Sequence, residues 1–201
     1  MKIIISKSSL EACVKNLCKV ISKKNALPIL GDILFDVNEQ EKTVRLTASD
    51  SEIWLSYQIQ LDDADGSGRF CVPANNLQAM LAEVREQPLA VFVDLIEKQQ
   101  VEMIYDNGWA KCQILNGDEY PMPIAMDSMD TSIIDFDGDN LSKAVKRSLF
   151  AIDTSEFRPN LSGVYLNFFD QQLDVVATNG SVLIKSEIQT DKDVAAGVII
   201  P

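Results

Sequence analysis

The chain has 201 residues, with 18 lysines and arginines against 30 aspartates and glutamates, and its formal charge at pH 7 is −12. It contains no histidine, which excludes Ser-His-Asp and Cys-His catalysis and removes the commonest metal ligand. So acidic a chain has no general affinity for nucleic acid, although exposed cations can act locally because charges more than about 8–10 Å apart are screened at physiological salt.

The four cysteines form no CxxC pair, and they are Cys13, Cys18, Cys71 and Cys112. We expect buried, reduced thiols, which are typical of a cytoplasmic protein rather than of a disulfide framework. The apolar run at the N-terminus is too short for the core of a signal peptide, and no run is long enough to span a membrane. We therefore expect a globular, cytoplasmic protein of one or two domains.

The first 61 residues predict one amphipathic helix among four strands. A short strand over residues 3–6 precedes a helix over 10–21, in which apolar residues such as Leu10, Val14 and Leu17 share one face. Alternating apolar residues then predict strands over 28–37, 43–48 and 53–61.

The next stretch has the same order of elements. A strand over residues 69–72 precedes a helix over 74–86, and three strands follow over 89–96, 100–105 and 109–115. The sequences EKQQ and DNG predict the two hairpin turns between these strands. This part of the chain ends near Tyr-Pro-Met-Pro at 120–123.

The order recurs a third time. A strand over residues 132–136, a helix over 141–152 and strands over 159–168, 172–178 and 181–188 are predicted, and residues 198–201 resemble the first strand of a fourth copy. An offset of 131 residues relates Leu10 to Leu141 and Pro28 to Pro159. Beyond the first hairpin the offset falls to 129, which predicts a shorter turn in the third copy.

These repeats predict an α+β protein built from three βαβββ units. Residues 1–123 form a first domain of two units, residues 124–131 form a linker, and residues 132–201 form the first half of a second domain. One and a half domains is an unusual length, so we expect the chain to be a truncated form of a longer one.

Cations gather on two of the predicted helices. Lys15, Lys19 and Lys23 follow one another at four-residue spacing and would form one stripe, while Lys143, Lys146 and Arg147 lie on the third helix. A solvated helix face explains such a stripe as readily as a surface for a polyanion. The second helix is different, because its one cation, Arg85, lies between Glu83 and Glu86.

Several stretches together resemble the β subunit of bacterial DNA polymerase III, the sliding clamp. They are MKIIISKSSLEACVKNL, NALPILGDILF, LTASDSEIWL, GRFCVPANNLQAML, KCQILNGDEYPMP, TSEFRPNLSGVYL, DVVATNGSVL and GVIIP. The similarity covers the whole chain in order. It implies the clamp fold, in which antiparallel sheets lie outside and helices line the inner face of a ring.

The resemblance implies a function without chemistry of its own. A full-length clamp closes head to tail as a homodimer ring around double-stranded DNA and holds the replicative polymerase on it; this chain alone is not expected to close a ring. The implied DNA-binding residues meet phosphates independently of sequence, and they are Lys15, Lys19, Lys23, Lys24, Lys143, Lys146, Arg147, Arg158 and Asn160. An ordinary turn set by Pro159 explains Arg158 and Asn160 equally well.

The resemblance also implies a pocket for short peptide motifs of the polymerase, the clamp loader and other clamp-binding proteins. The matching residues are Leu161, Thr178, Gly180, Ser181, Val182 and Leu183. Ser181 and Val182 stand where many clamps carry larger polar or basic residues. Packing of a strand-turn-strand core is the alternative explanation for Leu161 and Leu183.

Two other functions remain open at this point. Asp135, Asp137 and Asp139 could bind a divalent metal in a hydrolase or nuclease, but Gly138 does not fit the EF-hand spacing, and Asp139 or Asn140 as a helix N-cap is the better explanation. We therefore expect no metal and no cofactor. The other alternative is a peptide-binding module that does not bind DNA.

Overall fold

The computed structural model describes residues 1–22, 27–123, 134, 137–155, 157–191 and 194–200. The chain divides into two compact units, Met1–Pro123 and Ile124–Pro201. The predicted linker at 124–131 and nearly all of the predicted strand at 132–136 lie outside the described residues.

The first unit contains two helices and ten strands among its described residues. In chain order these are β1 (Lys2–Ser6), α1 (Lys7–Leu17), the 3-10 helix η1 (Pro28–Gly31), β2 (Asp32–Asn38), β3 (Thr43–Ser49), β4 (Trp54–Gln60), β5 (Asp63–Asp65), β6 (Gly68–Pro73), α2 (Ala74–Ala82), β7 (Pro88–Asp94), β8 (Gln100–Tyr105), β9 (Gly108–Gln113), β10 (Leu115–Asn116) and η2 (Gly117–Glu119). The short strands β5 and β10 were not predicted from the sequence.

The strands of the first unit form two antiparallel sheets. Sheet A has the order β5-β1-β7-β8-β9, and sheet B has the order β10-β6-β2-β3-β4. The two repeats exchange their first strands, since β1 pairs with β7 and β6 pairs with β2. Each repeat therefore completes the sheet of the other, and the two form one domain.

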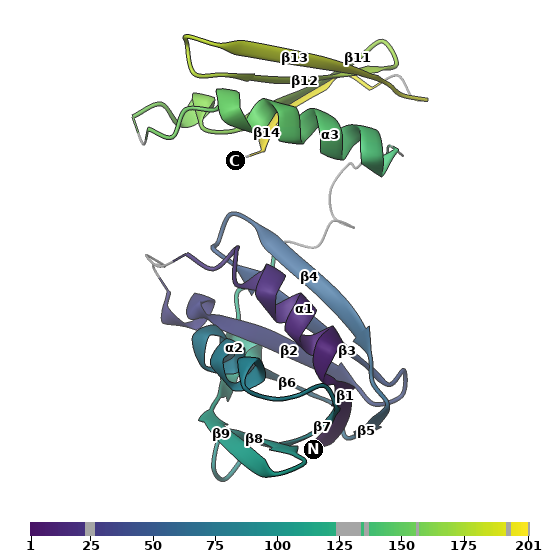
Figure 1. The fold of residues 1–201 in the computed structure, drawn as a ribbon, viewed down its shortest axis with the longest axis vertical. Coiled ribbons are helices and arrows are strands. Elements are labelled where there is room, and N and C mark those ends of the chain that lie inside the picture. Colours follow the sequence, from purple (N-terminus) through teal and green to yellow (C-terminus); the bar gives the residue numbers. More distant parts are fainter. Residues whose placement is uncertain (23–26, 124–133, 135–136, 156, 192–193, 201) are drawn as a thin grey trace. The chain divides into compact units, whose positions relative to one another are not determined.

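One core joins the helices to both sheets. Helices α1 and α2 lie side by side (Figure 1) and bury their apolar faces, with Leu10 and Val14 from α1 and Leu77 and Leu81 from α2. The strands contribute alternate residues, as the period of two in a β-strand requires. The other residue of each strand faces outward, away from the helices.

The second unit repeats the arrangement of sheet B. Its elements are α3 (Gly138–Ser148), the 3-10 helices η4 (Leu149–Ala151) and η5 (Pro159–Leu161), β11 (Val164–Phe169), β12 (Gln172–Thr178), β13 (Leu183–Gln189) and β14 (Ala196–Ile200). The sheet order is β13-β12-β11-β14, with α3 packed on β12 and β13 (Figure 1). This order matches β4-β3-β2-β6, so β14 takes the position that β6 takes in the first unit.

The helix boundaries differ from those predicted. Helix α1 begins at Lys7, where the Ser6 hydroxyl accepts a hydrogen bond from the Ser9 amide (3.4 Å), and it ends at Leu17 instead of Ile21. The first turn has the sequence KSS and carries no apolar signal, so periodicity alone missed it. The repeat offset is nevertheless conserved, because α3 starts and ends 131 residues after α1.

Candidate nucleic-acid interface

The cations of the first helix do not form the predicted continuous stripe. Lys15 is exposed in the last turn of α1. Lys19 lies two residues beyond the helix, where its Nζ donates a hydrogen bond to Oδ1 of Asn16 (3.0 Å). Lys23 and Lys24 lie outside the described residues. Helix α1 therefore presents Lys15, and the turn after it presents Lys19.

The three cations of α3 are exposed on its outer side. Ala144 and Ser148 are buried against the sheet, while Lys143, Lys146 and Arg147 face solvent. Lys146 and Arg147 occupy the last turn, where the helix dipole favours positive charge. Lys146 lies 131 residues after Lys15, at the same position in a helix of the same length.

These cations have no acidic partner within the described residues. Ion pairs within 4 Å involve Lys7, Lys42, Arg69, Lys111 and Lys185. In the same part of the chain, no such pair is formed by the predicted DNA-binding cations Lys15, Lys19, Lys143, Lys146, Arg147 and Arg158. Lys143 and Arg147 line a groove between α3 and β13 that also contains Glu187 and Asp191. Lys15 and Lys146 are therefore the more comparable pair.

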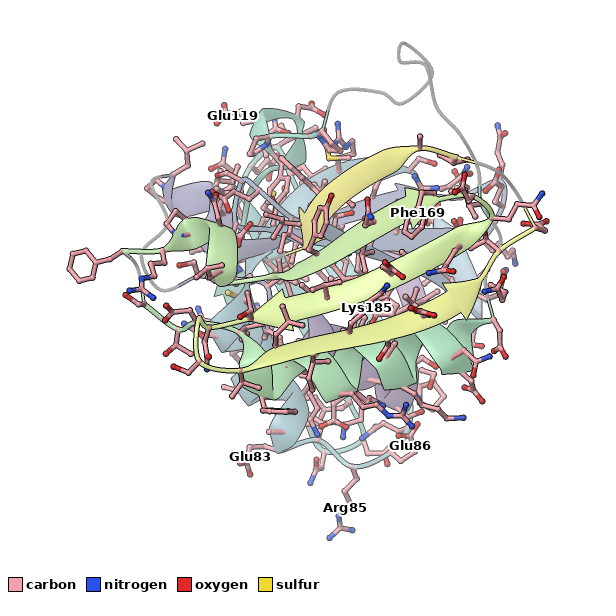
Figure 2. All side chains as sticks on the ribbon, turned by 90° about the horizontal axis from the view of Figure 1, so that it is seen from above. Glu83, Arg85, Glu86, Glu119, Phe169 and Lys185 are labelled. Carbon is pink, nitrogen blue, oxygen red and sulfur yellow. The ribbon has the colours of Figure 1, made fainter. Side chains whose placement is uncertain are left out.

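The second helix contributes no clear cationic surface. Figure 2 shows Glu83, Arg85 and Glu86 on the turn after α2, with the Arg85 side chain extending away from the ribbon. Asn76 is exposed, and its side-chain amide donates to Sγ of Cys112 (3.4 Å). The charge at this turn is net negative, in contrast to the ends of α1 and α3.

The loop before β11 is closed by a backbone hydrogen bond. The Asp153 amide donates to the Leu161 carbonyl (2.8 Å), which holds the two ends of the loop together. Arg158 and Asn160 are exposed in this loop, and Leu161 is half-buried. Both polar side chains are thus accessible, as the DNA-binding prediction requires.

The turn between β12 and β13 holds the other predicted binding residues. Oδ1 of Asn179 accepts from the amides of Ser181 (3.0 Å) and Val182 (2.9 Å), and the Thr178 hydroxyl donates to the Val182 carbonyl (2.7 Å). Gly180 adopts a φ of +89°, which favours glycine. The turn leaves Ser181, Val182 and Leu183 exposed.

Arg158 lies beside this turn. Its Nη1 is 3.5 Å from the position that a Cβ on Gly180 would occupy. The structure therefore brings a residue predicted to bind DNA next to residues predicted to bind a peptide.

The corresponding face of the first unit is covered by its own chain. Tyr120 is buried on Leu30, Leu34 and Cys71, and Nε1 of Trp54 donates to the Pro121 carbonyl (3.0 Å). Strand register maps Leu34 and Cys71 onto Tyr165 and Ile199, which are 39% and 41% exposed. Sequence reasoning missed this pair, although the 131-residue offset already relates Leu34 to Tyr165.

Beneath Tyr120 lies a group of buried titratable side chains. Burial raises the pKa of Asp32 to about 6. Burial, followed by the nearby Asp32 charge, raises the pKa of Cys71 to about 12. Burial also raises the pKa of Tyr120 to about 12. These groups belong to the packing of the first unit.

The acidic residues before α3 cap the helix. Oδ1 of Asp137 accepts from the Asp139 amide (3.0 Å), so the N-cap is Asp137 and not Asp139 or Asn140 as predicted. Asp135 lies outside the described residues. No cluster of three metal-ligating side chains occurs in the described part of the chain.

The cysteines are unpaired, and two of them are less buried than predicted. Cys71 and Cys112 are buried, whereas Cys13 and Cys18 on the α1 side of the core are half-buried. None of the described helices is long and apolar enough to cross a membrane.

Solved structures with the same arrangement identify the fold. The DNA polymerase III subunit beta from Pseudomonas aeruginosa matches the whole of this chain with a TM-score of 0.88, at 22% identity and over 54% of its own length. A DNA polymerase sliding clamp from Bacillus subtilis matches equally well, at 23% identity. The predicted α+β clamp fold is therefore confirmed.

Sequence comparison identifies the family. The model of the DNA polymerase III beta subunit N-terminal domain matches residues 1–125, so the chain belongs to this family. The beta sliding clamps of Bacillus subtilis and Staphylococcus epidermidis are 27% and 30% identical over 100% and 91% of this chain. The chain spans about half the length of these relatives, 54% and 49% respectively.

Proposed function

We propose that this chain provides part of a DNA sliding clamp, a non-catalytic processivity factor that encircles duplex DNA and docks the replicative polymerase. The helices α1 and α3 would face the sugar-phosphate backbone, while the sheets would form the outer surface. Weak contact with phosphates, without reading bases, allows a protein to slide along DNA. A cytoplasmic location follows from this function.

One observation carries the proposal. Two helices of identical length, 131 residues apart, place an exposed lysine at the same position, and neither Lys15 nor Lys146 pairs with a carboxylate in the described residues. The chain as a whole has a charge of −12, and its other described cations are largely engaged in ion pairs on the sheets. This distribution favours binding of a polyanion at the helices and repels it elsewhere.

Charge reversal tests this assignment. Replacing Lys15, Lys19 and Arg147 together by Glu should weaken binding of a fluorescent duplex at least about fivefold at about 20 mM salt, because each lost phosphate contact lowers the affinity. Fluorescence anisotropy measures the effect. Two duplexes of unrelated sequence should bind the unchanged protein within about twofold of each other.

A matched control keeps the total charge equal. Replacing Lys42, Arg45 and Lys98 by Glu makes the same change in net charge at exposed positions on a strand and on turns. This control should retain most of the affinity. Equal loss in both triple variants would mean that only net charge matters, and the assignment of the helices would be wrong.

We extend the proposal to protein partners. The exposed turn at 181–183 with Arg158 beside it supports docking of short peptide motifs from a polymerase and a clamp loader. Strands β9, β4 and β13 end their sheets, and such edges would serve the sheet-to-sheet contacts of a ring. The ring itself, a head-to-tail homodimer in full-length clamps, is proposed for a longer protein that contains this chain.

A further inference from the structure

The outer face of sheet A carries an uncovered apolar row. Strand register places Ile4, Ala90, Ile104 and Trp109 side by side across β1, β7, β8 and β9. Ile104 is 40% exposed and Trp109 is 61% exposed, and Phe92 on the neighbouring row is 39% exposed. Contiguous apolar surface of this kind is typical of an interaction site.

Sheet B indicates how unusual this exposure is within the same domain. Leu34 and Cys71 occupy the matching positions on β2 and β6, and both are buried because the segment ending in Tyr120 covers them. Sheet A has β5 where sheet B has β10, and no described segment covers its outer face. One of two equivalent faces is therefore closed, and the other is open.

Next to the apolar row runs a row of alternating charges. Across the five strands of sheet A the register gives Asp65, Lys2, Phe92, Glu102 and Lys111, in that order. The signs are negative, positive, neutral, negative and positive. Lys111 pairs with Glu102 (3.4 Å) and also lies over the ring of Trp109 (4.8 Å). Lys2 lies over the ring of Phe92 (5.7 Å).

This order of charges is complementary to itself. A two-fold axis that runs along Phe92, between two stacked copies of the sheet, exchanges the two ends of the row. Lys2 of one copy then faces Glu102 of the other, and Asp65 faces Lys111. Every charge meets the opposite sign, while the apolar rows lie against each other as in aligned sheet packing.

We propose that the outer face of sheet A is a self-association surface, through which two copies of this chain stack face to face. The surface consists of the apolar row, Phe92 and the four charged residues of the neighbouring row. It lies on the side of the sheet away from α1 and α2, so it does not use the predicted DNA-binding residues. The inference is independent of the proposed function and of pairing between strand edges.

Analytical ultracentrifugation of the chain over a wide concentration range tests the proposal. A reversible monomer–dimer equilibrium is expected. Trp109→Glu should weaken the dimer about tenfold or more, because it places a charge in the apolar centre. Ile53→Glu is the matched control, since Ile53 is 38% exposed on the turn before β4 and the substitution adds the same charge. This control should leave the equilibrium within about twofold.

A charge exchange tests the two-fold arrangement itself. Lys2→Glu and Glu102→Lys should each weaken the dimer about threefold, because each brings like charges together across the interface. The double variant should return to within about twofold of the original affinity. Neither residue lies on an edge strand at β9, so dimers that form by edge pairing would not follow this pattern.

The possible results separate cleanly. A dimer that weakens with Trp109→Glu and recovers in the double charge variant supports the proposal. A monomer at all concentrations, a dimer insensitive to Trp109→Glu, or a double variant no better than the single ones overturns it. Circular dichroism of each variant verifies that the fold is retained, and these positions are exposed or half-buried.

Discussion

Asp32 is a residue whose environment opposes its charge. It begins β2, is 7% exposed, and lies among Cys71 and Tyr120 under the covering segment of sheet B. Burial favours the neutral carboxylic acid, which is why its pKa rises from 3.8 to about 6. Nothing in the sequence DILFDV distinguishes this aspartate from an exposed one, since its burial depends on a segment more than 80 residues later.

Stability of the first unit should consequently depend on pH through Asp32. The folded state binds this proton more tightly than the unfolded state, so the contribution is fully present below pH 3.8 and is lost as pH rises through about 6. Asp32→Asn should raise the free energy of unfolding at pH 7.5 by up to about 3 kcal/mol, since one pKa unit corresponds to about 1.4 kcal/mol. Urea unfolding of both proteins at pH 5 and pH 7.5 measures the difference.

The result has a clear counterpart. The gain from the substitution should shrink at pH 5, where the wild-type carboxyl is largely protonated in the folded state. An equal gain at both pH values would place Asp32 in solvent. Asp36→Asn is the control, because Asp36 lies on the same strand but is exposed.

At the scale of elements, the segment Leu115–Pro121 determines how the two faces of the first domain differ. Strand β10 pairs with β6, and Gly117 fits because a Cβ there would lie 2.6 Å from the backbone of Arg69 and Phe70. Tyr120 then closes the outer face of sheet B. A two-residue strand and a 3-10 turn give no periodic signal, so sequence analysis recognised only a domain end at this place.

Removing this cover should destabilise the first unit. Tyr120→Ala should lower the free energy of unfolding by about 3 kcal/mol, because it deletes a buried aromatic ring and leaves a cavity against Leu34 and Cys71. Met122→Ala is the matched control, since Met122 is 47% exposed two residues later. Denaturant unfolding should give less than about 0.5 kcal/mol for the control. Similar losses in both would argue against the covering role.

At the scale of the whole chain, the two units have unequal cores. The first unit has one cluster of buried apolar side chains that spans both sheets and both helices, whereas the cluster of the second unit contains five fully buried residues in the described range. Buried apolar area is the main source of stability. The two units should therefore not unfold as one cooperative body.

Hydrogen exchange should reveal this difference. Amides of β12 should exchange at least about tenfold faster than amides of the matching strand β3, because local opening costs less where fewer apolar contacts are lost. Mass spectrometry of peptic fragments compares the two strands directly. Equal protection would indicate that the units stabilise each other.

The order of elements was accessible from the sequence because each repeat carries a strong periodic pattern. The strands over 100–105 and 172–178 were predicted with the observed bounds. The helix ends were wrong where capping by Ser6 and Asp137, and not apolar spacing, sets them. Lys19 was consequently assigned to a helix that ends before it. The covering segment and the exposure of Tyr165 and Ile199 depend on contacts between distant parts of the chain, which periodicity does not encode.

The shift in repeat offset from 131 to 129 has a consequence for how such chains can diverge. The hairpin of residues 39–42 between β2 and β3 corresponds to the two residues Asp170 and Gln171 between β11 and β12. A change of two residues leaves every following side chain on its original face, whereas a change of one would turn the whole strand inside out. Insertions and deletions at this hairpin should thus survive natural selection in even numbers, so that the parity of loop length becomes an inherited trait of the lineage.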